Sequence, residues 1–300
     1  MKQTADYKNL ISLIEKYCVK EGRVYTKIPL FNFFTATKES EFQHIVYEPS
    51  LCIALQGEKA VGFAGQMYSY NSTKYLLTCT NVPADIKIGK CSKDNPYIAL
   101  VLRFTLEEIY EVIKETKDVI TKKTKTIQSP LCFNKLDETL IEPIYKLVKL
   151  LDKPQEMIDF IAPLIKKEII YILLQNDGDF LKNYVLEGTL ANKIVKVISE
   201  IKNNFMEPIN VAKITQDVGM SEASFYQNFK KVTSMSPLQF QKKIKLEEAK
   251  QMLLSQNLPA HEVAFNVGYE SASQFSREYS RMYGMSPKAH SEFLRTVTSA

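Results

Sequence analysis

Residues 214–237 of this 300-residue chain read ITQDVGMSEASFYQNFKKVTSMSP, and residues 263–287 read VAFNVGYESASQFSREYSRMYGMSP. The Val-Gly pair at position 218 returns at position 267, after 49 residues. The Met-Ser-Pro triplet at position 235 returns at position 285, after 50 residues. A repeat at a fixed period is one structural unit used twice. The last third of the chain is therefore expected to hold two copies of one unit.

Each copy has the pattern of a helix-turn-helix. In the first copy, apolar residues at helical spacing stop at Gly219, where glycine takes a left-handed backbone at little cost. Ser221 then provides a favourable N-cap for the next helix. In the second copy, Ser271 and Gln274 form a variant of the capping box at the same place. The residues expected to be buried in these second helices are Phe225, Phe229 and Val232 in one copy and Phe275 and Tyr279 in the other.

The spacing of the two units suits double-stranded DNA. A helix is predicted from Pro237 to about Ser255, with Ser236 as its cap and proline in its first turn. About 19 residues of helix span about 28 Å. That length is comparable with the roughly 34–36 Å between successive major-groove faces of B-DNA. One polypeptide can therefore place two recognition helices on one face of the duplex.

The rest of the chain divides into a β-rich part and a helical part. Short β-rich runs separated by turn residues predict a sheet sandwich or barrel, and they occupy residues 42–47, 51–56, 59–64, 74–80, 86–91 and 97–104. Thr105 and Glu108 then form a capping-box start. Amphipathic helices are expected at 136–151, 157–175 and 190–203, with a break at 176–179. The domain boundary is expected between about Asn176 and Leu190.

Composition excludes several classes of protein. No apolar run approaches the roughly 20 residues that a membrane span needs, and the first ten residues lack the pattern of a secretory signal. Five scattered cysteines favour a reducing cytoplasm over a disulfide framework. They are expected to be small buried hydrophobic residues, with thiol sensing as the alternative for Cys52, Cys79 and Cys91. From residue 190 onward there are 14 Lys and Arg against 10 Asp and Glu, so most of the net charge of +5 lies on the repeat.

Residues 209–290 resemble the DNA-binding domain of the AraC/XylS family of bacterial transcription regulators. The stretch 267–284, followed by Ser286-Pro287, carries this resemblance. Residues 46–59, VYEPSLCIALQGEK, with Tyr70 and residues 96–100, are similar to the sensor domain of one branch of that family. The resemblance implies an α+β fold. A cupin-like β-barrel with flanking helices is expected in residues 1–180, and an all-α domain with two helix-turn-helix units joined by a linker helix in residues 188–300.

The family pattern places base-reading side chains on the exposed face of each recognition helix. Glutamine can pair bidentately with adenine and arginine with guanine, whereas alanine offers only an apolar contact to a thymine methyl. Carried over to this chain, the base-reading positions are Ala223, Tyr226 and Gln227 in the first copy, and Ala272, Ser273, Gln274, Ser276 and Arg277 in the second.

Phosphate contacts are expected beside these positions. Backbone amides at the two helix starts, near Ser221 and Ser271, can hold phosphate. By charge and exposure, the expected phosphate neighbours are Lys230, Lys231, Lys242, Lys243 and Arg281. The chain departs from the family pattern at two positions. Thr215 replaces the alanine that allows a close helix crossing, as Ala264 does in the second copy, and His290 stands where arginine is common.

These observations favour a sequence-specific DNA-binding regulator of a bacterial promoter, controlled by a small molecule bound in the N-terminal domain. The resemblance favours an activator over a repressor. It also implies homodimerisation and contact with RNA polymerase. The effector is unknown. Two alternatives stay open: a cupin-type enzyme with an accessory DNA-binding domain, and a ligand-independent DNA binder. No catalytic residue, cofactor or metal is expected, because His44 is the one histidine in the barrel segment and a cupin metal site needs about three clustered ligands.

Overall fold

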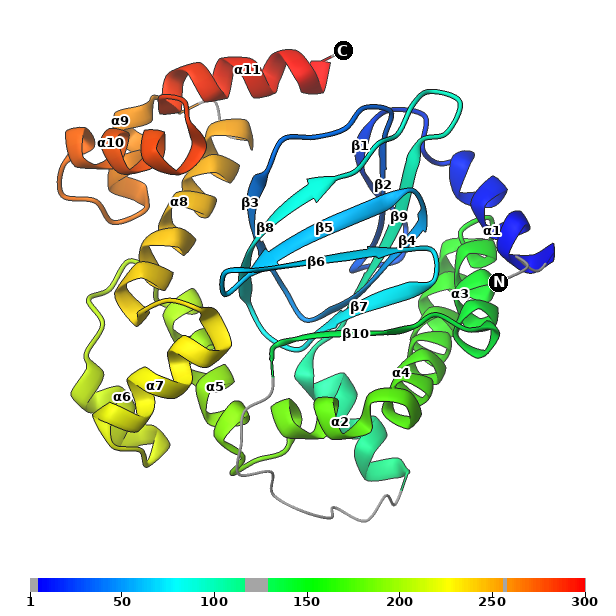
Figure 1. Cartoon of the computed structure of the whole chain (residues 1–300), viewed down its shortest axis with the longest axis horizontal. Helices are drawn as coiled ribbons and strands as arrows, with labels where there is room; N and C mark the ends of the chain where they lie inside the picture. The colour runs from blue at the N-terminus through cyan, green and yellow to red at the C-terminus, as the bar shows by residue number, and fades with distance from the viewer. Residues whose placement is uncertain (1–4, 117–128, 256–257, 300) are drawn as a thin grey trace. The chain divides into compact units, whose positions relative to one another are not determined.

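The computed structural model describes residues 5–116, 129–255 and 258–299 (Figure 1). The chain divides into two compact units. One comprises residues 1–43 and 47–192, and the other comprises residues 193–300 together with 44–46. The fold is α+β, with a sheet-rich N-terminal unit and a helical C-terminal unit.

Two sheets make up the centre of the N-terminal unit. The six-stranded sheet has the order β1-β2-β9-β4-β7-β10, and the four-stranded sheet has the order β3-β8-β5-β6. The strands are β1 (Gly22–Tyr25), β2 (Phe31–Ala36), β3 (Gln43–Tyr47), β4 (Ser50–Gln56), β5 (Glu58–Phe63), β6 (Gln66–Asn71), β7 (Lys74–Thr78), β8 (Val82–Ile88), β9 (Tyr97–Arg103) and β10 (Leu131–Lys135). The sheets enclose a common interior without closing into one continuous barrel, so the expected cupin-like architecture is present in an open form.

The two faces of the six-stranded sheet have different neighbours. Ile53, Leu100 and Phe33 are cross-strand partners on one face and are fully buried. This face packs on helices, since the ring of Tyr17, just after α1 (Ala5–Glu15), lies 6.0 Å from that of Phe33. Cys52 and its cross-strand partners Leu76 and Val101 lie on the opposite face, because side chains alternate along a strand. This face is turned towards the four-stranded sheet, since the charge of Lys59 on β5 acts on Cys52. The remaining helices of this unit are α2 (Leu106–Glu115), α3 (Glu138–Leu150) and α4 (Gln155–Val185).

Helix α4 differs from the sequence-based expectation at its C-terminal end. The expected break at 176–179 is a kink inside one helix, where Asp177 has φ −130° and ψ 30°. The Asp177 carboxylate is buried and accepts hydrogen bonds from Tyr75, Cys132 and Asn134 of strands β7 and β10. Because these strand donors satisfy the carboxylate, the helix bends at Asp177 and resumes beyond it instead of ending.

The C-terminal unit is built from helices alone. They are α5 (Leu190–Asn203), α6 (Val211–Val218), α7 (Glu222–Thr233), α8 (Pro237–Ser255), α9 (Ala260–Asn266), α10 (Ala272–Tyr283) and α11 (Pro287–Ser299). Helix α8 begins at Pro237, as predicted. Ser236 and Gln239 exchange the two hydrogen bonds of a capping box at its start, and the predicted box of Thr105 and Glu108 also forms at α2. In the described part of the chain, no helix is long and apolar enough to cross a membrane.

Candidate nucleic-acid interface

Helices α6 and α7 form the first helix-turn-helix. Gly219 ends α6 with φ +60°, in the left-handed region that the sequence predicts. The Ser221 side chain accepts from the backbone amide of Ser224 and so caps α7. Phe225, Phe229 and Val232 are fully buried. The local sequence therefore fixes the turn, and the aromatic pair fixes which face of α7 stays exposed.

Helices α9 and α10 repeat this arrangement. Gly268 has φ +78°, and the Ser271 side chain accepts from the amide of Gln274. Phe275 and Tyr279 are fully buried in a cluster that includes Ala264. The side chain of Gln274 turns forward to Glu278, at 3.2 Å, so the expected capping box is only half formed.

The exposed face of α7 carries most of the positions expected to read bases. Ala223, Tyr226, Gln227 and Lys230 are all exposed, as is the cap Ser221. Asn228, which helical periodicity places on the same face, is buried, and its amide donates to the carbonyl of Ser224 at 2.8 Å. Asn228 is therefore not available on the exposed face, because its amide finds a partner inside its own helix.

The exposed face of α10 carries more charge. Ser273, Gln274, Arg277 and Arg281 are exposed, whereas Ser271, Ala272 and Ser276 are partly buried. Ala272 packs against the aromatic cluster beneath the helix. Gln227 and Arg277 lie 50 residues apart and occupy the same position in the two copies. The two faces thus share a backbone frame but present different side chains.

Glu278 organises the polar side chains around α10. Its carboxylate accepts from Lys242 at 2.9 Å, from Tyr269 at 2.8 Å and from Gln274. Burial acts to raise the pKa of Glu278, but the hydrogen bonds from these three donors outweigh it and the net shift is downward. Lys242, expected from the sequence to be a phosphate neighbour, is therefore already paired with a carboxylate.

Thr215 and His290, the two departures from the family pattern, are both accommodated. The Thr215 hydroxyl donates back to carbonyls of its own helix, at 2.9 Å for Val211, so the buried residue leaves no unsatisfied polar atom. His290 lies in α11, with Nδ1 3.0 Å from the Tyr279 hydroxyl. Burial, followed by the charge of Lys250, lowers the pKa of His290. His290 therefore contributes a neutral hydrogen bond where an arginine would bring a charge.

The cysteines weighed as thiol sensors differ in accessibility. Cys52 and Cys79 are buried, and burial raises the pKa of both thiols. A protonated thiol is a weak nucleophile, so these two positions suit packing better than redox sensing. Cys91 is partly exposed. Within the described residues, no three His, Cys, Asp or Glu side chains come together in a way that could hold a metal ion.

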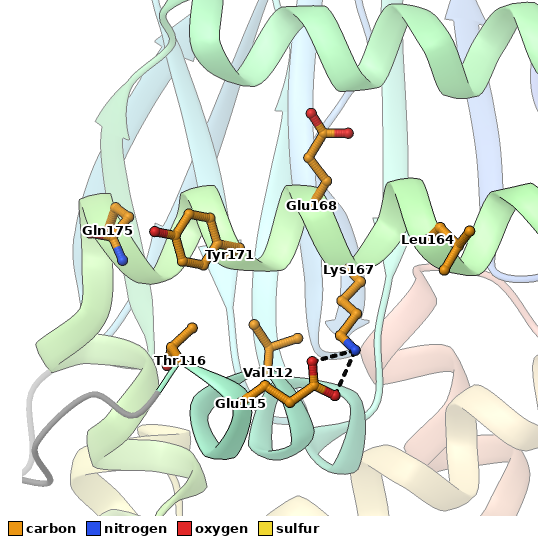
Figure 2. A pocket seen from close by; sticks show the side chains of 8 residues that line it. All are labelled: Val112, Glu115, Thr116, Leu164, Lys167, Glu168, Tyr171 and Gln175. Atoms are coloured by element: carbon orange, nitrogen blue, oxygen red, sulfur yellow. Dashed lines mark hydrogen bonds and ion pairs between the residues drawn. The ribbon is translucent and has the colours of Figure 1, made fainter.

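A surface groove of about 640 Å³ lies between α2 and α4 in the N-terminal unit. Figure 2 shows Leu164 and Tyr171 of α4 along this groove, with an ion pair between Lys167 and Glu115 of α2. The same face of α4 also exposes Met157 and Phe160. These four apolar side chains recur at intervals of three, four and seven residues, which is the spacing of one helix face.

Two family models match this chain. Residues 27–179 match the AraC-type transcriptional regulator N-terminus, and residues 214–292 match a helix-turn-helix domain. The chain is 30% identical to the probable transcriptional regulator LumQ of Photobacterium leiognathi over 34% of its own length and 41% of LumQ. It is 20% identical to the lactose operon transcription activator of Staphylococcus xylosus over 82% of its own length and 84% of that protein.

The fold is also that of a solved regulator. The apo K231A form of ToxT from Vibrio cholerae strain SCE256 aligns with a TM-score of 0.59 and 10% identity, over 91% of this chain and 98% of ToxT. The chain spans about two-fifths of the length of LumQ and of MtrA from Neisseria gonorrhoeae in the matched regions. Since the N-terminal model alone covers half of the chain and the doubled helix-turn-helix follows it, this protein belongs to the AraC-type transcriptional regulators.

Proposed function

We propose that this chain regulates transcription by placing α7 and α10 in successive major grooves on one face of a promoter. The observation that carries the proposal is the 19-residue helix α8, which joins two copies of one helix-turn-helix. Figure 1 shows α7 and α10 near opposite ends of α8 within the C-terminal unit. A helix of this length is about 28 Å long, close to the repeat of the major groove.

The two recognition helices are proposed to read different sequences. Arg277 can donate two hydrogen bonds to guanine, whereas Gln227 suits adenine. Ala223, Tyr226, Ala272, Ser273, Gln274 and Ser276 complete the proposed base-reading set. Lys230 and Arg281, with the helix starts at Ser221 and Ser271, are the proposed phosphate contacts. An asymmetric site with two unlike half-sites about one helical turn apart follows from this arrangement.

The N-terminal unit is proposed to sense a small molecule. ToxT, which shares the fold, has been solved with an unsaturated fatty acid and with (E)-4-(8-methylnaphthalen-1-yl)but-3-enoic acid. Carboxylic acids with a large apolar part are therefore the first effector class to test here. A ligand can shift the activity of the chain only if it binds one arrangement of the protein more tightly than another. Activation through RNA polymerase is the proposed output, on the strength of the family resemblance.

A second copy of the chain is the proposed occupant of the exposed face of α4. Four apolar side chains project from this face, namely Met157, Phe160, Leu164 and Tyr171, and Phe160 is 72% exposed. Lys166 and Lys167, on the same half of α4, already pair with Glu108 and Glu115 of α2. Two antiparallel copies of α4 would bury the four apolar side chains against each other. Burial of this apolar face favours a two-fold homodimer.

Selection of binding sites from a random duplex library with the full chain tests the DNA-binding proposal. We expect an enriched asymmetric site with two unlike motifs about 10 base pairs apart, and affinity that falls steeply with salt. The alternative of a non-specific DNA binder predicts no enrichment at all. A selected site in which the two motifs about 10 base pairs apart are inverted copies of each other would contradict the proposal that α7 and α10 read different sequences.

Sedimentation velocity of Leu164→Glu tests the dimer separately. A glutamate there places two like charges against each other at the proposed two-fold axis, so we expect a monomer at concentrations where the wild type is a dimer. Phe42→Glu, at an exposed phenylalanine away from α4, is the matched control and should remain dimeric. A wild-type chain that sediments as a monomer, or two variants that behave alike, would remove the dimer from the proposal.

A further inference from the structure

The interior between the two sheets holds a cluster of polar side chains. Tyr47, Cys52, Tyr70 and Tyr97 come from strands of both sheets and are each no more than 5% exposed. Lys59 of β5 joins them, with its Nζ 5.2 Å from the centre of the Tyr47 ring. Cys52 is close enough to influence the titration of Lys59, Tyr47 and Tyr97. These five side chains therefore form one compact group, although each comes from a different strand.

Strand register explains why Lys59 points into this interior. Lys59 is the cross-strand partner of Tyr70 on one side and of Ile88 on the other. Val61, two residues further along β5, lies on the same face and is fully buried. Because side chains alternate along a strand, Lys59, Val61, Tyr70 and Ile88 share the inward face. The alternation of side chains along β5 therefore directs Lys59 towards the space between the two sheets.

The cluster contains a cation, and the described part of the chain supplies no counter-charge for it. Among the described residues, no carboxylate lies within ion-pair distance of Lys59. Burial raises the pKa of Cys52, Tyr47, Tyr70 and Tyr97, so these side chains stay neutral at physiological pH and do not balance the ammonium. Burial also lowers the pKa of Lys59, which is the response of an ammonium group without an anionic partner.

Tyr47 supplies a second polar group that points to a ligand. Its hydroxyl is buried, and no hydrogen-bond partner lies within reach of it in the described chain. A buried donor without a partner costs free energy, so native proteins rarely keep one without a functional or structural reason. The partly buried ammonium of Lys59 and the buried hydroxyl of Tyr47 both lack an acceptor, so a negatively charged oxygen between the sheets could accept a hydrogen bond from each.

We propose that Lys59 and Tyr47 bind the carboxylate of an amphipathic monocarboxylic acid, whose apolar part lies among the aromatic and aliphatic side chains between the sheets. The neighbours that would contact the apolar part are Val61, Tyr70, Ile88 and Tyr97. Tyrosine suits this place because it combines a large apolar ring with a polar tip. The inference rests on the proposed sensor function and names its ligand class and head-group site.

Isothermal titration of the full chain with dodecanoate, compared with dodecan-1-ol, tests the head group directly. Both probes have the same chain length and differ in charge. We expect dodecanoate to bind at least about tenfold more tightly, because a charge-assisted hydrogen bond and an ion pair form only with the carboxylate. Equal affinities, or binding of neither probe, would overturn the proposal. This measurement contains no DNA, so its result is independent of whether the chain recognises a promoter.

Variants of the two polar residues locate the site. Lys59→Met keeps the length of the side chain without its charge, and Tyr47→Phe removes only the hydroxyl. We expect dodecanoate affinity to fall at least about tenfold in the first and about threefold or more in the second, with dodecan-1-ol unaffected. Lys74→Met, at an exposed lysine on β7, is the matched control and should bind as the wild type does. Unchanged dodecanoate affinity in both Lys59→Met and Tyr47→Phe would contradict the assignment.

The melting temperature of Lys59→Met separates a ligand site from a purely structural role. If the ammonium is an uncompensated charge in the free chain, its removal should raise the melting temperature while abolishing the extra stabilisation by dodecanoate. A structural lysine would instead lower the melting temperature and leave the dodecanoate increment intact. Should Lys59→Met fail to fold, the Tyr47→Phe variant and the comparison of the two probes still decide the proposal.

Discussion

The Nζ of Lys245 donates a hydrogen bond to the carbonyl oxygen of Gly268 at 2.8 Å, and Lys193 makes the same contact with Gly219 at 3.2 Å. Lys193 lies on α5 and Lys245 on α8, each of them the helix before a helix-turn-helix. A lysine therefore satisfies the carbonyl of each turn glycine. The repeated unit thus comprises three helices, α5–α7 and α8–α10, and it begins earlier than the sequence match suggests.

Gly268→Ala should destabilise the C-terminal unit more than Gly219→Ala. Both glycines have positive φ, so alanine costs about 1–2 kcal/mol at either position. At Gly268 an added Cβ would also lie 3.0 Å from Lys245 Nζ and 3.2 Å from Met206 Cα, whereas at Gly219 the nearest atom is 3.7 Å away. We expect a further loss of about 1–3 kcal/mol at Gly268 from overpacking. Urea denaturation measures both losses, and equal values would show that the close contact at Gly268 relaxes freely.

Ser234→Gly should stabilise the chain. Ser234 ends α7 with φ +58°, and Gly284 ends α10 at the equivalent position with φ +72°. The first copy therefore keeps a serine in a left-handed conformation that glycine adopts more easily. We expect a gain of about 0.5–1 kcal/mol in the free energy of unfolding. Gly284→Ser is the reciprocal control and should lose stability, so a loss in both variants would mean that the serine hydroxyl matters more than the backbone.

The stability of the second helix-turn-helix should fall as the pH is lowered below about 6.5. His290 faces Tyr279 and Tyr283, with Lys250 and Glu247 nearby, and its pKa is below the usual value of 6.5. The unfolded chain then binds the proton more readily than the folded chain. The contribution of His290 is complete above pH 6.5 and is lost as the pH falls through the lowered pKa. Thermal melting at pH 7.5 and pH 5.5 should differ less in His290→Gln than in the wild type. An identical difference in both would assign the pH effect to other groups.

Arg277→Ala should reduce sequence discrimination more than Gln227→Ala. The two residues are equivalent in the repeat, and both are exposed. A bidentate contact to a base contributes about 1–3 kcal/mol of discrimination, and the arginine contact is also charge-assisted. Affinities for the selected site and for its single-base variants measure the effect. Equal losses of discrimination in the two variants would argue against unequal half-sites, while a uniform loss of affinity at all sequences would make Arg277 a phosphate contact.

The C-terminal unit was predictable because its structure is decided locally. Gly219, Ser221 and Pro237 specify a turn, a cap and a helix start through their own backbone preferences, and all three behave as expected. Two side-chain amides differ from the local pattern because of the hydrogen-bond acceptors that they find. Asn228 turns inward to its own helix, and Gln274 turns to Glu278, because a side-chain amide takes whichever acceptor lies nearest.

The N-terminal unit was only partly predictable. Strands β4, β5, β7 and β9 lie close to their expected positions, but β1, β2, β6 and β10 were not predicted as separate strands. The hairpin of β5 and β6 turns through Ala64 and Gly65, both with positive φ, and an alanine gives little signal for such a turn. The order of strands in the sheets joins residues far apart in the chain, so local patterns do not contain it.

The sequence by itself determined the doubled helix-turn-helix, the exposed faces of α7 and α10 and the family, because periodicity, caps and turn glycines act within a few residues of each other. Only the tertiary structure brought Tyr47, Cys52, Lys59, Tyr70 and Tyr97 into one interior cluster and bent α4 at Asp177. In sequence, these residues are scattered members of ordinary strands. Pairing across two sheets decides their environment, and burial between the sheets then decides their charge and their chemistry.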